Sequence, residues 1–213
     1  MDAQYSDRAG AKDAPGAQRL LLATRNEHKR REFARLLPGF QVDGLPDEVT
    51  LPPEDDSTFE DNALSKARAA AAATGRTSIA DDSGIEAAAL HGAPGVRSAR
   101  YAGEDASDEQ NLAKLLREAP AGSPLAYVCV LAYVDPVAGV ERVFEGRCTG
   151  RLADSPRGEG GFGYDPAFLP ACPRTGDEES GGVTMAQLSD ERKDAISHRG
   201  SAVRALCEWL ISK

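Results

Sequence analysis

Two runs of β-forming residues, separated by a short connector, constrain the fold of this chain more than any other feature. The first run, residues 125–134, is almost wholly apolar, whereas the second, residues 140–148, alternates apolar with charged side chains. The connector between them, Asp135-Pro136-Val137-Ala138-Gly139, has the proline and glycine typical of turns. The pattern predicts an antiparallel β-hairpin whose second strand has one face in solvent.

Strands that lead into helices precede this hairpin. The run Arg19–Thr24 predicts a buried strand, and Phe33 and Leu37 mark one face of the helix after it. Further on, Ser57-Thr58-Phe59-Glu60 has the S-x-x-E pattern of a capping box and predicts an alanine-rich helix that Gly75 ends. At 213 residues the chain is long enough for one large α/β domain or two small ones.

Composition argues against several functional classes. The net charge of -9 disfavours non-specific nucleic-acid binding, and no apolar run approaches the roughly 20 residues of a membrane span. Four scattered cysteines without paired metal spacing indicate free thiols in a reducing, cytoplasmic compartment. We expect residues 1–18, rich in Ala, Asp, Gly and Pro, to be a disordered extension, and residues 19–213 to form a single domain.

An acidic pair follows one of the apolar runs. In Ile79-Ala80-Asp81-Asp82-Ser83-Gly84, the apolar residues predict the end of a buried strand, and Ser83-Gly84 predicts the turn that leaves it. Carboxylates in that position lie where open α/β sheets bind ligands. Because adjacent acids repel each other, the pair needs a cation, a basic partner or solvent. A solvated Asp-Asp turn is the alternative interpretation at this point.

The sequence also contains groups suited to phosphate. Thr24-x-Asn26-x-x-Lys29 places a hydroxyl, an amide and a cation at a helix N-terminus, although an ordinary capped helix has the same pattern. Asn62 and Lys66 share a face of the alanine-rich helix. Glu54 could reach a cation held by the Asp81-Asp82 turn, or it could belong to a loop of solvated acids.

A glycine-rich stretch, residues 158–166, could contact a flat ligand. Its glycines permit close approach of the backbone, Phe162 could stack on a base, and Asp165 could accept from a ring N–H. A glycine-rich surface loop with one buried aromatic is the alternative. Near the C-terminus, His198 and Arg199 at a helix start offer donors for a carbonyl oxygen, and the short helix before them carries Lys193.

Taken together, these motifs resemble the inosine/xanthosine triphosphate pyrophosphatase family in order and spacing. The resemblance extends from about residue 20 to the C-terminus. It is carried by Thr24-x-Asn26-x-x-Lys29, Phe59-x-x-Asn62-Ala63-x-x-Lys66-Ala67, Ile79-Ala80-Asp81-Asp82-Ser83-Gly84, Ala93-Pro94-Gly95-x-x-Ser98-Ala99-Arg100-Tyr101, Gly160-Gly161-Phe162-Gly163-Tyr164-Asp165-Pro166 and Ile196-Ser197-His198-Arg199-Gly200. The resemblance implies an elongated, two-lobed α/β fold with a long central mixed sheet flanked by helices. It also implies a nucleotide cleft between the lobes and, usually, a homodimer.

The resemblance implies an activity and a set of site residues as well. The activity is Mg²⁺-dependent hydrolysis of ITP, dITP and XTP to the monophosphate and pyrophosphate, which removes deaminated purines from the nucleotide pool. Asp82 would be the general base or a metal ligand, with Asp81 as the alternative base, and Glu54 would be the second acidic ligand of Mg²⁺. The substrate-binding residues that it implies are Thr24, Arg25, Asn26, Glu27, His28, Lys29, Lys66 and Ser83, followed along the chain by Phe162, Gly163, Tyr164, Asp165, Lys193, His198 and Arg199.

Selectivity for these bases has a physical rationale. Inosine and xanthine carry a 6-oxo acceptor where adenine carries a 6-amino donor, so donors from Arg199 or His198 would pair with the oxo group and leave an amino group unsatisfied.

Two alternatives stay open: a pyrophosphatase of the same fold that acts on other modified nucleotides, and a nucleotide-binding regulatory module without turnover. Three features depart from the family pattern, namely Arg25, where many relatives have glycine, residues 1–18 and the acidic segment Asp177-Glu178-Glu179.

Overall fold

The computed structural model describes residues 18–54, 58–171 and 182–212. The expected disordered extension, apart from Gln18, and the acidic segment 177–179 lie outside these residues. Gln18 itself is the first residue of a strand, which begins one residue earlier than the predicted run Arg19–Thr24.

A six-stranded mixed sheet forms the centre of the molecule, with strand order β2-β1-β3-β4-β5-β6. The first three of these strands are parallel to one another, and the pairs β3–β4, β4–β5 and β5–β6 are antiparallel. The predicted hairpin is confirmed and is longer than expected at both outer ends. The strands are β1 (Gln18–Leu22), β2 (Phe40–Gly44), β3 (Ser78–Ala87), β4 (Pro124–Asp135), β5 (Val140–Leu152) and β6 (Phe168–Pro170).

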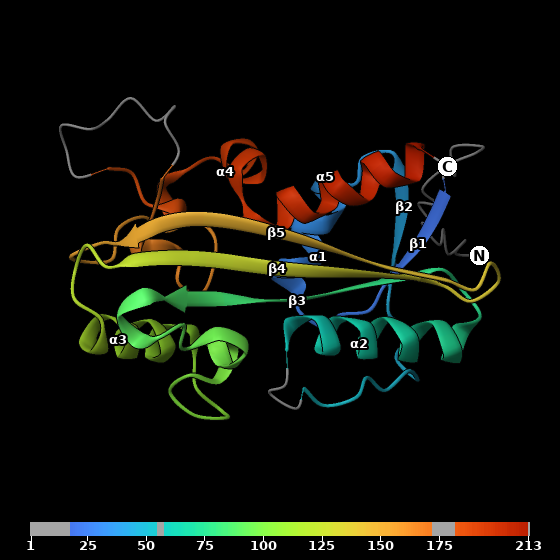
Figure 1. Cartoon of the computed structure of the whole chain (residues 1–213), viewed down its shortest axis with the longest axis horizontal. Helices are drawn as coiled ribbons and strands as arrows, with labels where there is room; N and C mark the ends of the chain where they lie inside the picture. Colours follow the sequence, from blue (N-terminus) through green and yellow to red (C-terminus); the bar gives the residue numbers. More distant parts are fainter. Residues whose placement is uncertain (1–17, 55–57, 172–181, 213) are drawn as a thin grey trace, which may run out of the picture.

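Helices cover both faces of the sheet, as Figure 1 shows: α2 and α3 lie on one face, and α4 and α5 lie on the other. The α-helices are α1 (Glu27–Leu36), α2 (Phe59–Thr74), α3 (Asp108–Glu118), α4 (Asp190–Ile196) and α5 (His198–Ile211). Short 3₁₀ helices are η1 (Ala88–Leu90), η2 (Gly95–Arg100), η3 (Asp165–Ala167) and η5 (Met185–Gln187).

Helix α2 packs closely on β3 and β4 because its inner face is made of small residues. Ala63, Ala67 and Ala70 are fully buried in the same cluster as Ala80 and Val130 of the sheet. The predicted C-terminal glycine, Gly75, adopts the left-handed conformation that ends helices. At the other end the N-cap is Thr58, which accepts from the Asp61 N–H. Ser57, the predicted cap, lies outside the described residues.

The expectation that β3 ends at Ala80 is wrong. The strand continues without a turn through Asp81-Asp82-Ser83-Gly84 to Ala87, because β4 pairs with it along its whole length. Residues 85–87 form the last part of β3, and η1 follows directly. Gly84 is not a turn residue: a Cβ there would overlap the Gly95 carbonyl oxygen and Ser98 Oγ, so it lets η2 pack against β3.

The molecule is elongated, and the long strands β3, β4 and β5 run between two ends (Figure 1). One end contains β1, β2 and α2, and the other contains α3 and β6. The buried apolar residues form separate clusters, one around α3 and η5 and two on the opposite faces of the sheet near α2 and α5. This arrangement agrees with the predicted two-lobed fold. No helix in the described part of the chain has the length and apolar character needed to cross a membrane.

Candidate active site

A cavity of about 250 Å³ lies where β1 separates from β3. The pairing of these parallel strands ends at Leu22 and Ile79, so the next residues of β3 border the cavity along an open edge. The carboxyl end of a parallel strand is the place where open α/β sheets bind ligands. Predicted site residues from both lobes line the cavity: Thr24, Asn26, Lys29, Glu54, Lys66, Asp82, Ser83, Phe162, Gly163, Tyr164, Asp165, Lys193, His198 and Arg199. Arg25, Glu27 and His28, which are also described, lie outside this lining.

The two adjacent aspartates of β3 point to opposite faces of the sheet, since side chains alternate along a strand. Asp81 is only 1% exposed and lies on the side of α1 and α5. Its Oδ2 is 3.0 Å from Lys29 Nζ and accepts from Arg199 Nη2 at 3.1 Å. Burial alone would raise the pKa of Asp81, but the positive charges of Lys29 and Arg199 outweigh burial and hold the pKa well below its usual range.

Asp82 faces α2 and borders the cavity. Asn62 Nδ2 donates to Asp82 Oδ2 at 2.9 Å, and Lys66 Nζ lies 3.5 Å from Asp82 Oδ1. The same ammonium group is 2.7 Å from Glu54 Oε1. Burial raises the pKa of Asp82 above its usual 3.8; Lys66 opposes this shift, and the negative charge of Glu54 adds to it. Asp82 is therefore the more readily protonated member of the acidic pair.

Glu54 and Asp82 are the carboxylates that could hold a divalent cation at this end of the cavity. The described residues contain no group of three or more His, Cys, Asp or Glu side chains arranged for a metal ion. Two carboxylates on one cavity wall, sharing a lysine, still fit Mg²⁺, which usually takes one or two protein carboxylates and completes its shell with water and substrate phosphates.

The N-terminus of α1 has the geometry expected of an anion site. Asn26 is the N-cap, and its side chain accepts from the Lys29 N–H at 3.1 Å, which confirms the predicted helix start. Thr24 Oγ1 accepts from the Asn26 N–H at 3.2 Å. Lys29 reaches the cavity wall from the first turn of the helix.

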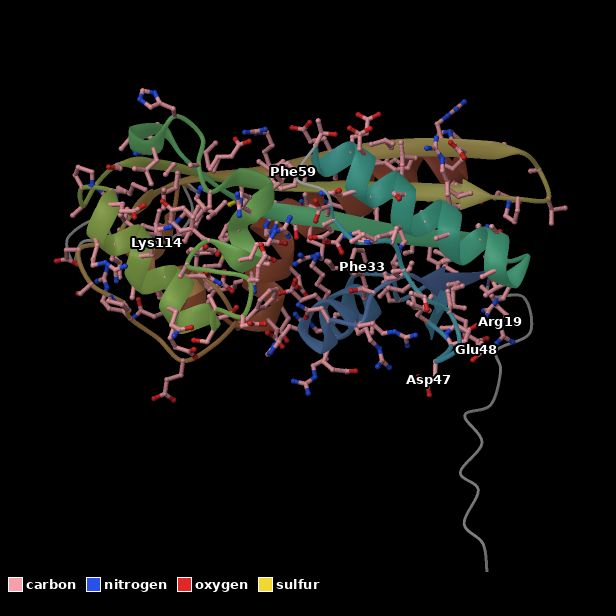
Figure 2. All side chains as sticks on the ribbon, turned by 90° about the horizontal axis from the view of Figure 1, so that it is seen from below. Arg19, Phe33, Asp47, Glu48, Phe59 and Lys114 are labelled. Carbon is pink, nitrogen blue, oxygen red and sulfur yellow. The ribbon has the colours of Figure 1, made fainter. Side chains whose placement is uncertain are left out.

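Arg25 turns away from the cavity. Its guanidinium donates to the carbonyl oxygens of Leu45 and Pro46, at 2.9 and 2.7 Å, and to that of Val49. It also lies 3.5 Å from Asp47, which sits at the periphery of the molecule in Figure 2. Arg25 thus holds the loop after β2 through these hydrogen bonds. No contact of this side chain supports the predicted role in substrate binding.

The glycine-rich stretch forms the opposite wall of the cavity, and Asp165 holds it in place. Asp165 Oδ2 accepts from the Phe162 N–H at 3.0 Å and from Lys193 Nζ at 2.7 Å, and Oδ1 accepts from the Tyr127 hydroxyl at 3.0 Å. Both oxygens of Asp165 accept from protein donors, and its predicted contact with a ring N–H of a base stays a prediction. Its role in the structure is to position Phe162 and Lys193.

Arg199 is likewise engaged by protein groups. Besides Asp81, it pairs with Glu32 and donates to Ser83 Oγ at 2.8 Å. Arg199 also lines the cavity, so its predicted role as a donor to a carbonyl oxygen of the base stays a prediction. His198, next to it, is 6% exposed. Burial lowers the pKa of His198 well below its usual 6.5, and the charges of Arg199 and Lys193 lower it further, so the imidazole is neutral.

His28 contacts the site from outside the cavity lining. Its ring stacks on Phe162 with centroids 5.0 Å apart and an interplanar angle of 24°. His28 belongs to α1 and Phe162 to the glycine-rich stretch, so this contact joins the two walls of the cavity.

A sequence model of the Ham1 family matches residues 20–209 of the chain. The chain belongs to the Ham1 family. A protein from Geobacter sulfurreducens, named dITP/XTP pyrophosphatase, is 46% identical over 200 residues, which cover 90% of this chain and 96% of the relative. A Mycobacterium tuberculosis protein of the same name is 46% identical over 208 residues, covering 91% of this chain and 96% of the relative.

Solved Ham1 structures have the same fold. The Ham1 protein of Staphylococcus aureus superimposes with a TM-score of 0.77 at 40% identity, covering 92% of this chain and 99% of the other. A HAM1 protein from Coxiella burnetii gives a TM-score of 0.77 at 36% identity, covering 92% and 100%. The fold and family implied by the sequence resemblance are thereby confirmed.

Four polar groups at the site of this Ham1 protein were not among the predicted site residues. Glu32 pairs with Lys193 and Arg199. It lies three residues after Lys29 and so on the same face of the predicted helix, a spacing from which its place at the site could have been predicted. Asp108 accepts from the Gly163 N–H, and Ser98 Oγ accepts from the Ile85 N–H. Ser98 lies in a family motif, whereas Asp108 is the first residue of α3, next to the N-cap Ser107. Tyr127 lies inside an apolar run, and nothing local distinguishes it from a core residue.

Proposed function

We propose that this Ham1 family protein hydrolyses the triphosphates of deaminated purines, namely ITP, dITP and XTP, to the monophosphate and pyrophosphate. The observation that carries the proposal is one cavity with two chemically different ends. Two carboxylates and a lysine, Glu54, Asp82 and Lys66, lie at one end. An aromatic ring and a neutral imidazole, Phe162 and His198, lie at the other. The names of relatives about 46% identical to this chain support the same reaction.

At the phosphate end, this chain supplies fixed positive charge and a base. Lys29, Lys66 and the N-terminus of α1 bind the triphosphate, which carries close to four negative charges. Asp82 orients the attacking water and takes its proton, a role to which its raised pKa is suited. Mg²⁺, when bound by Glu54 and Asp82, would neutralise charge on the phosphoryl group under attack.

At the base end, stacking and hydrogen bonding select the purine. The base stacks on Phe162, and neutral His198 donates one N–H to the 6-oxo group. An adenine amino group would leave that donor unsatisfied, and a buried unsatisfied donor is a strong basis for rejection. Arg199, held by Asp81 and Glu32, fixes the first turn of α5 beside the base.

The same proposal includes a homodimer, which the family resemblance implies, and a cytoplasmic location, which the cysteine content indicates. Cys129, Cys148 and Cys207 are free thiols in the described chain, which agrees with a reducing compartment. A pyrophosphatase for other modified nucleotides would share all of this geometry. A regulatory module without turnover is disfavoured, because Glu54, Lys66 and Asp82 are all present and in contact.

A substrate panel tests the function. Purified protein with Mg²⁺ should release pyrophosphate from ITP, dITP and XTP at least ~100-fold faster, in kcat/KM, than from ATP or GTP, in line with selection by a buried hydrogen bond. EDTA should abolish the release. Comparable rates with ATP would contradict the selectivity, faster rates with another modified nucleotide would favour the first alternative, and binding without turnover would favour the second.

A further inference from the structure

Tyr127 of β4 contacts two residues at the base-binding end of the cavity, Asp165 and His198. The residue is 7% exposed and lines the cavity. Its hydroxyl donates to Asp165 Oδ1 at 3.0 Å, while its ring stacks on His198 with centroids 4.6 Å apart and an interplanar angle of 9°. Phe168 also contacts the tyrosine ring, with the ring centroids 4.5 Å apart. One rigid side chain therefore contacts the residue that holds the glycine-rich stretch and the imidazole at the start of α5.

The hydroxyl completes the set of donors around Asp165. Lys193 Nζ and the Phe162 N–H both bond to Oδ2, so Tyr127 is the donor that fixes Oδ1 and with it the rotation of the carboxylate. Burial raises the pKa of Tyr127 well above its usual 10.0, and the charge of Asp165 raises it further. The hydroxyl thus stays protonated and remains a donor throughout the physiological pH range.

The ring of Tyr127 orients His198. His198 Nδ1 is buried and has no hydrogen-bond partner among the described residues. The plane of the imidazole is therefore set by its near-parallel stacking on Tyr127 rather than by a bond at that nitrogen. The direction in which His198 presents its N–H to the cavity depends on this contact.

We propose that Tyr127 is a positioning residue that sets the base selectivity of the site, by fixing Asp165 through its hydroxyl and His198 through its ring. The inference rests on the proposed function. The contacts described for Tyr127 lie at the base end, whereas Glu54, Lys66 and Asp82 at the phosphate end contact one another. Loss of the hydroxyl should therefore weaken recognition of the base and leave phosphate binding and the chemical step unchanged.

The test compares Tyr127→Phe, which keeps the ring and removes the hydroxyl, with Tyr133→Phe. Tyr133 lies on the same strand and is 1% exposed, but its ring packs against Trp209 outside the cavity. For Tyr127→Phe we expect KM for ITP to rise ~10-fold and the ITP/ATP preference to fall by a similar factor, the size expected for a lost hydrogen bond to a charged group. The kcat for ITP and the inhibition constant of inorganic triphosphate, which has no base, should stay unchanged. Tyr133→Phe should change none of these quantities.

An unchanged KM for ITP in Tyr127→Phe, or a loss of triphosphate binding that parallels the rise in KM, would overturn the proposal. An equal loss of the ITP/ATP preference in Tyr133→Phe would also overturn it. So would failure of Tyr127→Phe alone to fold, because the hydroxyl would then be purely structural. If the wild-type protein turns over no nucleotide, the proposed function fails, yet calorimetric binding of IMP and AMP still tests Tyr127. A lower IMP/AMP affinity ratio in Tyr127→Phe would then support the positioning role, and an unchanged ratio would overturn it.

Discussion

Two adjacent aspartates on β3 differ in the properties that decide their chemistry. Asp81 is buried against Lys29 and Arg199, and these cations keep its pKa low. Asp82 lies on the other face, borders the cavity and has a raised pKa because of its burial and the nearby Glu54. Under the proposed function, Asp82 is therefore placed to take a proton from water and Asp81 to hold two cations in position.

Asp82→Asn tests this division of roles. Asparagine keeps the shape but cannot accept the proton, so kcat for ITP should fall ~10²–10⁴-fold, the usual contribution of a general base. The affinity for IMP, measured by calorimetry, should stay within a few-fold of wild type.

Asp81→Asn, in contrast, leaves Lys29 and Arg199 without their buried partner and should lower the free energy of unfolding by ~3–5 kcal/mol. Full turnover in Asp82→Asn would reassign the base to Asp81.

At the scale of elements, the base end depends on how closely α5 approaches the sheet. The helix begins at His198, with Ser197 as its N-cap accepting from the Gly200 N–H at 3.0 Å. Gly146 of β5 lies directly against this first turn. A Cβ on Gly146 would overlap the His198 carbonyl oxygen and the Ala202 backbone nitrogen. The absence of a side chain on the strand therefore decides where the helix, and the imidazole that it carries, can sit.

Gly146→Ala should displace the start of α5. We expect a loss of ~1–3 kcal/mol in the free energy of unfolding, typical of an overpacked contact, together with a reduced ITP/ATP preference. Gly39→Ala is the matched control, because nothing lies within 4 Å of a Cβ at Gly39. Urea unfolding and the substrate panel measure both effects. An unchanged preference in a destabilised Gly146→Ala would show that the position of α5 does not determine selectivity.

At the scale of the whole molecule, a buried network of ion pairs joins the two walls of the cavity. Glu32 of α1 pairs with Lys193 of α4 and Arg199 of α5, and Arg199 continues to Asp81 of β3. Burial would raise the pKa of Glu32, but the two cations outweigh it and lower the pKa below its usual 4.5. The pKa of Asp81 is lowered from 3.8 in the same way. The ion pairs that hold the helices on this side of the sheet therefore require these carboxylates to be ionised.

The network predicts acid sensitivity. A carboxylate whose pKa is lower in the folded state contributes stability above its unfolded pKa and loses it as the pH falls through the folded value. For Glu32 and Asp81 this stability is fully present at pH 7 and should decline below about pH 4.5, by up to ~1.4 kcal/mol per group and pH unit. Urea unfolding between pH 7 and pH 3 measures it. Glu32→Gln should be less stable at pH 7 and show a shallower decline; an equal decline in both proteins would exclude Glu32 as a source.

Much of the local structure could be predicted from the sequence, because it depends on neighbouring residues. The cap at Asn26, the end of α2 at Gly75 and the hairpin around residues 135–139 follow from side-chain bonds, backbone freedom and periodicity over a few positions. The family motifs also identified most of the residues that line the cavity. The end of β3 was mispredicted because Ser83-Gly84 has the local chemistry of a turn, whereas pairing with distant β4 keeps it extended.

The sequence by itself determined the family, the central hairpin, the start of α1, the end of α2 and most of the charged groups that line the cavity. Only the tertiary structure decided which of those charges meet: Arg199 reaches Asp81 across 118 positions and Glu32 across 167, and Asp165 takes its donors from three separate elements. The physical reason is that a buried charge must find its partner in space. The packing of the helices on the sheet determines which partner that is, and short-range sequence patterns do not predict this packing.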